Sequence, residues 1–86
     1  MELQFGTRVR ISEDSRHETA TFPTAVIAGE GIRLFGHEEE EFRYIAVFEN
    51  QKGGKNIMAK LYTEEIAEVL EVLPIQEAAI IYREAR

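Results

Sequence analysis

Apolar and polar residues alternate along the first segment of the chain. Every second residue from Leu3 to Ile11 is apolar, except Thr7, and the residues between them are polar or glycine. A period of two is that of a strand with one buried face. We therefore expect a half-buried strand over residues 2–11. An exposed loop should follow over residues 13–21, where almost nothing is apolar.

The middle of the chain contains further strand patterns. Residues 24–36, TAVIAGEGIRLFG, hold two short apolar pieces around Gly29 and Gly31. They form either a hairpin that turns at these glycines or one strand broken by a bulge. Residues 42–49, FRYIAVFE, carry apolar residues on both faces, which predicts a central strand. Residues 57–62 alternate again after a glycine turn, so the two segments predict an antiparallel hairpin.

The pattern changes to the period of a helix at Thr63. Thr63 is a good N-cap, and the two glutamates after it favour the positive end of a helix dipole. Apolar residues then recur at helical spacing until Pro74, which ends the pattern. These residues are Ile66, Val69, Leu70 and Leu73. We expect one amphipathic helix over residues 63–73, with its apolar face on the sheet.

The C-terminal segment, residues 75–86, is compatible with a strand or a helix. Gln76, Glu77, two alanines and Arg83 favour a helix, whereas the β-branched and aromatic run at 80–82 favours a strand. We favour an edge strand, because a chain that leaves a helix ended by proline often returns to the sheet.

These elements predict an α+β fold with a single domain over residues 1–86. It consists of a small antiparallel sheet of four to five strands with the helix 63–73 packed on one face. A chain of 86 residues has a thin core, which disfavours a cofactor-filled cleft and favours an oligomer that shares its core. The apolar fraction of 44% is that of an ordinary globular protein. The absence of cysteine excludes a disulfide framework and a thiolate zinc site.

The charge of the chain is acidic, with sixteen acidic and ten basic residues and a net charge of −6 at pH 7. This balance opposes non-specific binding to nucleic acid or to an anionic membrane. The sequence also lacks the roughly 18 consecutive apolar residues of a membrane span and the apolar core of a signal peptide. We therefore expect a cytoplasmic protein with no membrane association.

Motifs for nucleotide binding are incomplete. The run Lys52-Gly53-Gly54-Lys55 lacks the first glycine and the hydroxyl residue of a P-loop, and it leads into a strand. The glycines at 29 and 31 lack the third glycine of a dinucleotide-binding fingerprint. Both runs are better explained as turns, in which glycine supplies a positive φ.

The sequence contains no clear motif for metal binding or for catalysis. Two clusters of acidic residues and histidine, at 13–18 and 37–41, show no metal-binding spacing, and four consecutive glutamates diverge. A site would form only if the two loops met and brought His17 and His37 together. No nucleophile motif is present. We expect a non-enzymatic protein with no cofactor.

Basic residues on several predicted strands form a candidate nucleic-acid face. If these residues share one side of the sheet and aromatic rings lie between them, the basic groups would pair with phosphates and the rings would stack on the bases of a single strand. The six positions are Arg8, Arg10, Arg43, Lys52, Lys55 and Lys60.

The order of elements over residues 42–73 resembles that of the single-stranded DNA-binding coactivators. In that family a strand, a turn with lysine and glycine, another strand and a helix close the domain. The resemblance implies a dimer that binds DNA on a curved sheet through Arg43, Lys52, Lys55 and Lys60. This chain departs from the family in Pro74, which shortens the helix, and in its acidic charge.

The function that we expect is that of a small acidic protein-interaction or regulatory module. Long strands such as 2–11 and 42–49 leave edges that need cover in so small a sheet, and pairing between subunits supplies it. The module would act as a homodimer or larger oligomer, or it would bind a partner protein with a basic surface. The alternative is a single-stranded nucleic-acid-binding domain that uses the basic face and the Lys52–Lys55 hairpin.

Overall fold

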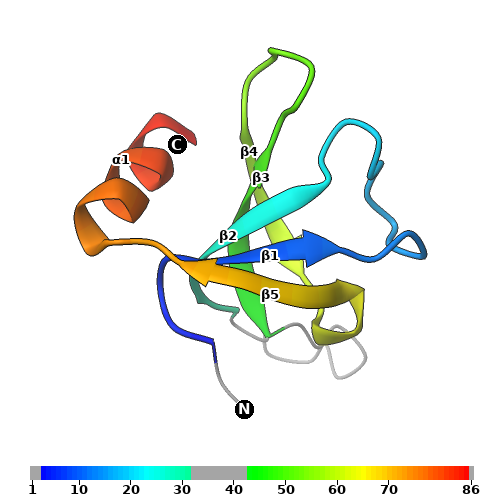
Figure 1. Ribbon diagram of the computed structural model, residues 1–86, viewed down its shortest axis with the longest axis horizontal. Helices are drawn as coiled ribbons and strands as arrows, with labels where there is room; N and C mark the ends of the chain where they lie inside the picture. The colour runs from blue at the N-terminus through cyan, green and yellow to red at the C-terminus, as the bar shows by residue number, and fades with distance from the viewer. Residues whose placement is uncertain (1–2, 32–42, 86) are drawn as a thin grey trace, which may run out of the picture.

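The computed structural model of the protein describes residues 3–31 and 43–85 (Figure 1). Within these residues one antiparallel sheet of five strands has the order β4-β3-β2-β1-β5. The elements are β1 (Thr7–Ile11), β2 (Thr24–Glu30), β3 (Tyr44–Glu49), β4 (Ile57–Leu61), the 3-10 helix η1 (Thr63–Glu65), β5 (Ile66–Val72) and α1 (Ile75–Ala85). The small α+β fold with an antiparallel sheet is therefore confirmed.

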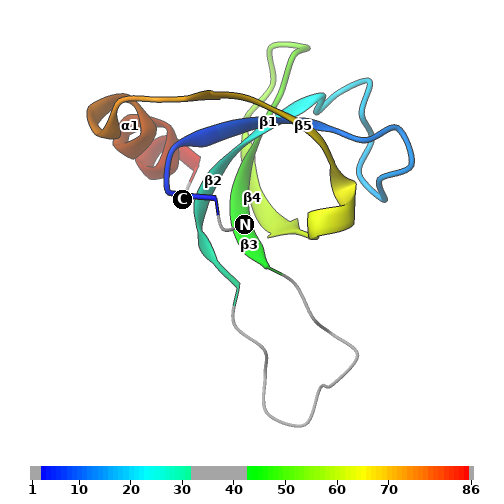
Figure 2. The same ribbon diagram turned by 60° about the horizontal axis from the view of Figure 1, so that its bottom comes forward.

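The sheet curls around one apolar cluster (Figure 2). Leu61 on one edge strand and Ile66 on the other pack against the same buried residues of the central strands. The two edges therefore bend toward each other, and η1 connects them. We call the face that lines this cluster the inner face. Its remaining buried residues are Val9, Ile11, Ala25, Ile27, Tyr44, Ala46 and Phe48.

Helix α1 packs on the opposite, outer face of the sheet. Ala78, which is 1% exposed, lies in a cluster with Val26 of β2 and Leu73, and Ile81 packs against the same cluster. The small side chain at 78 allows the helix to approach the sheet closely. This helix has 11 residues. Among the described residues no helix is long and apolar enough to cross a membrane.

The expected edge strand in the segment 75–86 is wrong, because residues 75–85 form α1. The carbonyl of Pro74 accepts a hydrogen bond from the N–H of Ala78 (3.0 Å), which is the first bond of the helix. Proline is tolerated at a helix start, where its missing N–H costs no hydrogen bond. Pro74 therefore precedes a helix here, whereas the sequence reasoning used it to end one.

The predicted helix over residues 63–73 is also wrong, because most of this segment forms β5. Strand β5 pairs with β1 through two bulges, so two residues of β1 correspond to three residues of β5. Ile66, Val69 and Val72 lie opposite Ile11, Val9 and Thr7. A strand with such bulges carries apolar residues at a spacing of three, which resembles the helical period. The order of elements in the single-stranded DNA-binding coactivators ends with a helix, so the resemblance does not extend to residues 66–72, which form β5 in this chain.

The hairpin predicted over residues 42–62 is confirmed. Strands β3 and β4 are antiparallel, with Tyr44 opposite Leu61, and β3 lies between β4 and β2. Strand β2 has an irregularity between Ile27 and Gly29, so the described part of its segment is one bulged strand. Its residues 32–36 lie outside the described residues.

The first strand is shorter than predicted, because it begins after Gly6. Gly6 has φ 93°, its N–H donates to the carbonyl of Ile27 (2.8 Å), and its own carbonyl accepts from Leu73 N–H (2.9 Å). A Cβ at this position would lie 3.2 Å from both the carbonyl oxygen of Leu73 and the Cβ of Ala78. The change of direction at Gly6 sends Phe5 to the outer-face cluster, while Thr7 is buried in β1.

Replacing this glycine should destabilise the fold. Gly6→Ala forces an L residue into a left-handed conformation and against the backbone of Leu73, which should lower the free energy of unfolding by about 1–3 kcal/mol. Chemical denaturation measures the change. Gly29→Ala is the matched control, because a Cβ there meets no atom within 4 Å, and its effect should stay within about 0.5 kcal/mol. Equal effects of the two substitutions would contradict this explanation.

Candidate functional site

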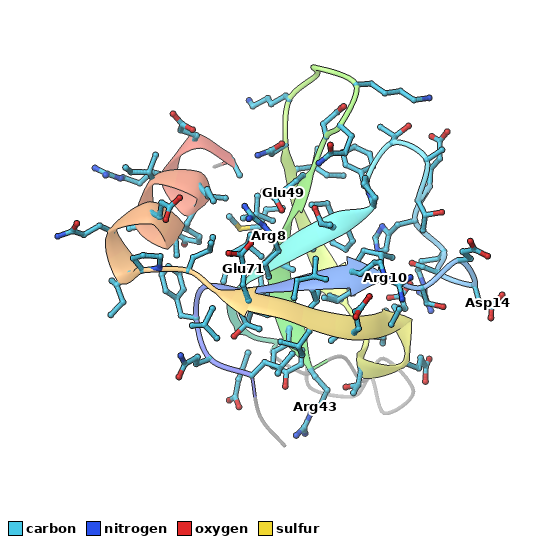
Figure 3. The ribbon with its side chains drawn as sticks, in the orientation of Figure 1. Arg8, Arg10, Asp14, Arg43, Glu49 and Glu71 are labelled. Atoms are coloured by element: carbon cyan, nitrogen blue, oxygen red, sulfur yellow. The ribbon has the colours of Figure 1, made fainter. Side chains whose placement is uncertain are left out.

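Arg8 lies at the centre of a charge network on the outer face, between Glu49 and Glu71 (Figure 3). Its Nε and Nη2 donate to the two carboxylate oxygens of Glu49 (3.0 and 2.9 Å), and its Nη1 donates to Glu71 (2.7 Å). Thr24 Oγ1 also donates to Glu49 (2.9 Å). The network therefore connects four neighbouring strands, from β3 across β2 and β1 to β5.

The two arginines of β1 both have carboxylate partners. The hydrogen bonds to Glu49 outweigh partial burial and, together with Glu71, raise the pKa of Arg8 above its ordinary value. Arg10 donates from Nε to Glu68 of β5 (2.7 Å), and both of these side chains are about half exposed. Two of the six basic positions in the predicted nucleic-acid face thus lie in ion pairs that attach β5 to the sheet.

The other four basic positions are separated along the hairpin. Arg43 is exposed next to Tyr44, at the start of β3, whereas Lys52 and Lys55 are exposed in the turn beyond the end of β3. Lys60 lies on β4 and lines a cavity described below. The structure therefore places the six predicted residues at different parts of the sheet.

Strand β5 exposes large apolar side chains at the edge of the sheet. Val69, Leu70 and Val72 are about half exposed, and Ile75 at the start of α1 is 75% exposed. We call these four residues the β5 surface. Since β5 is last in the strand order, its outer edge pairs with no strand among the described residues. Exposed apolar groups beside an unpaired edge are typical of an interaction site.

Charges are segregated along the sequence that forms the two edges. Residues 61–82, which include β5, contain five glutamates and no lysine or arginine. Residues 50–62, which include β4, contain three lysines and no acidic residue. The two segments that contain the edge strands therefore differ in charge, although they are consecutive in the chain.

A cavity of about 270 Å³ lies between the β1–β2 loop and β4. The guanidinium of Arg16 stacks 4.3 Å from the ring centroid of Tyr62. The ring of His17 packs on Phe48 with 4.1 Å between centroids, and its Nε2 lies 3.2 Å from the carbonyl oxygen of Lys60. The cavity, which we call the Arg16 cavity, is lined by Arg16, His17, Ala59, Lys60 and Tyr62.

Buried Glu65 holds the loop that carries Arg16 and His17. One carboxylate oxygen accepts hydrogen bonds from Ser15 Oγ (2.6 Å) and from the N–H of Arg16 (3.1 Å). The other accepts from the N–H of Tyr62 (3.1 Å). Burial by itself raises the pKa of this carboxyl, but these hydrogen bonds and the nearby His17 bring its pKa below the ordinary value. Glu65 is therefore ionised at neutral pH.

Sequence reasoning missed the role of Glu65, because its contact with Ser15 spans 50 residues of the chain. It placed Glu65 in the first turn of a helix and His17 in a solvated cluster. No group of three metal-ligating side chains occurs among residues 3–31 and 43–85, and the second cluster, with His37, lies outside them. Comparisons with protein-family models, with curated proteins and with solved structures give no match to this chain.

The Arg8 network should contribute more to stability than the pair beside it. Arg8→Ala leaves Glu49, whose side chain is 16% exposed, without its two charge-assisted hydrogen bonds, so the free energy of unfolding should fall by about 1–3 kcal/mol. Arg10→Ala removes a half-exposed pair and should cost less than about 1 kcal/mol. Urea unfolding of both variants measures the difference. A larger loss for Arg10→Ala would contradict the assignment.

The carboxylate of Glu65 should give the stability a dependence on pH. Because its pKa is lowered by folding, its contribution is complete above the pKa of the unfolded chain, about 4.3, and is lost as the pH falls through the folded pKa. Glu65→Gln should therefore lower the melting temperature at neutral pH, and the difference from the unmodified protein should shrink in acid. Thermal unfolding followed by circular dichroism tests this. Glu64→Gln, a change at an exposed neighbour, should melt like the unmodified protein.

Proposed function

We propose that the protein is a non-enzymatic interaction module that binds a basic, extended segment of a partner protein along the β5 surface. The observation that carries this proposal is the row of exposed apolar side chains on an edge strand. An extended segment placed beside β5 gains hydrogen bonds from the main chain of the edge, and apolar contacts from alternate side chains. The bulges opposite β1 interrupt a regular ladder, so side-chain contacts would contribute a large part of the affinity.

Charge favours a basic partner over a second copy of the chain. Glu68 and Glu71 of β5 are paired with Arg10 and Arg8, but Glu64 and Glu77, which are exposed beyond the two ends of β5, have no ion pair among the described residues, so the acidic groups left for a partner flank the strand. Arg8 and Arg10 are already engaged by glutamates of their own chain. A partner segment that alternates apolar and basic residues would complement both the apolar and the acidic character of this edge.

A designed peptide tests this proposal. A synthetic peptide that alternates valine and lysine should bind and shift the amide NMR signals of β5, whereas a peptide that alternates valine and glutamate should not. The double substitution Leu70→Ser and Val72→Ser should weaken binding about tenfold, because both side chains are exposed apolar contacts. Ile57→Ser is the matched control, since Ile57 is 41% exposed on the other edge strand. This control should leave the affinity unchanged.

Two results would overturn this assignment. Signals that shift on β4 instead of β5, or an equal loss in the control, would place binding elsewhere. A dimer in sedimentation that dissociates in the Leu70→Ser and Val72→Ser variant would identify the occupant of this edge as a second copy.

A further inference from the structure

The Arg16 cavity is a positive site on an acidic protein. Arg16, His17 and Lys60 line it, and no acidic side chain does so among the described residues. The turn that holds Lys52 and Lys55 adjoins the same loop, because the N–H of Gln51 donates to the carbonyl of Thr21 (2.9 Å). Arg16, Lys52 and Lys55 therefore place positive charge along this flank of β4, beside the carboxylate of Glu65, although the net charge of the chain is −6.

The stacking of Arg16 leaves donors for a ligand. When a guanidinium lies over an aromatic ring, the flat face of the guanidinium contacts the ring. The five N–H groups of the guanidinium lie in its plane and point outward. One edge of Arg16 faces Glu65 through Nε at the long distance of 3.9 Å, which is a weak ion pair. The contact with Tyr62 therefore positions the guanidinium of Arg16, while the Nη groups of Arg16 stay able to form the paired hydrogen bonds that suit phosphate.

His17 is also held in a defined orientation. A carbonyl oxygen only accepts hydrogen bonds, so the contact with Lys60 O requires the proton on Nε2. Packing on Phe48 fixes the plane of the ring.

We propose that the Arg16 cavity binds a phosphate monoester. A phosphate group carries a charge of −1.5 to −2 at about neutral pH and accepts several hydrogen bonds, which matches the guanidinium of Arg16 with the imidazole of His17 beside it. The volume of about 270 Å³ lies just below the usual range of small-molecule pockets, so the site suits one anionic group with a compact attachment. This site is separate from the β5 surface and does not depend on the partner proposed there.

A titration followed by NMR at constant ionic strength tests the site. Inorganic phosphate, adenosine monophosphate and phosphotyrosine are the three probes, and each should give saturable shifts at Arg16, His17 and Tyr62. Arg16→Ala should weaken binding about tenfold or more. The fold should persist in this variant, because the side chain is 64% exposed and the backbone N–H to Glu65 remains. Arg83→Ala removes the same charge from an exposed position on α1 and should change nothing.

The probes also separate the sources of the phosphate. Tighter binding of the nucleotide would indicate a nucleotide ligand, and tighter binding of phosphotyrosine would indicate a phosphorylated side chain; either supports the site. Shifts that do not saturate, or equal losses in Arg16→Ala and Arg83→Ala, would overturn it. Oligonucleotide binding that is lost in a Lys52→Ala and Lys55→Ala variant but kept in Arg16→Ala would replace it with a nucleic-acid surface.

Discussion

The ionised carboxylate of Glu65 is the interaction on which the connection between the two edges of the sheet depends. It lies in η1, the short connection between the two edge strands, and it is 5% exposed. A buried charge is stable only when hydrogen bonds replace the water that it loses. Ser15, Arg16 and Tyr62 supply these bonds from the β1–β2 loop and from the end of β4. The same carboxylate thus fixes the path of the chain between the edges and the position of the Arg16 cavity.

Strand β5 depends on charges at more than one point. Glu65 fixes its beginning, and Arg10 and Arg8 bind Glu68 and Glu71 further along the strand. The spacing of these glutamates follows from the bulges, which place residues three apart on β5 opposite residues two apart on β1. Because the ladder with β1 attaches the strand and the two ion pairs add to it, its apolar residues are not all needed for packing. This division explains how an edge strand can be attached firmly to a thin core and still expose the β5 surface.

The sequence predicts those parts of the fold in which the period agrees with the structure. Strand β3 is apolar on both faces, strand β4 alternates, and a glycine turn joins them, so their hairpin was predictable. Strand β5 was not, because its bulges give a spacing of three, and α1 was missed because Pro74 fits the start of a helix as well as its end. The charged sites were beyond sequence reasoning for another reason. The partners of Arg8 follow only from the register of three other strands, and the role of Glu65 follows only from its hydrogen bond to Ser15, which lies 50 residues away in the chain.

Net charge is a poor guide to the partners of a small sheet. Residues 50–62, which carry three lysines, are followed in the chain by the segment up to residue 82, which carries five glutamates. The net charge of the whole chain, −6, does not show this difference. The turn at η1 sends these two segments to two different edge strands, β4 and β5, where charges exposed to solvent are screened over a Debye length of about 8 Å. The partner segment that we propose for β5 is basic, whereas the ligand that we propose for the Arg16 cavity is an anion. One domain of 86 residues can therefore hold two surfaces with opposite preferences, and binding at one need not compete with binding at the other.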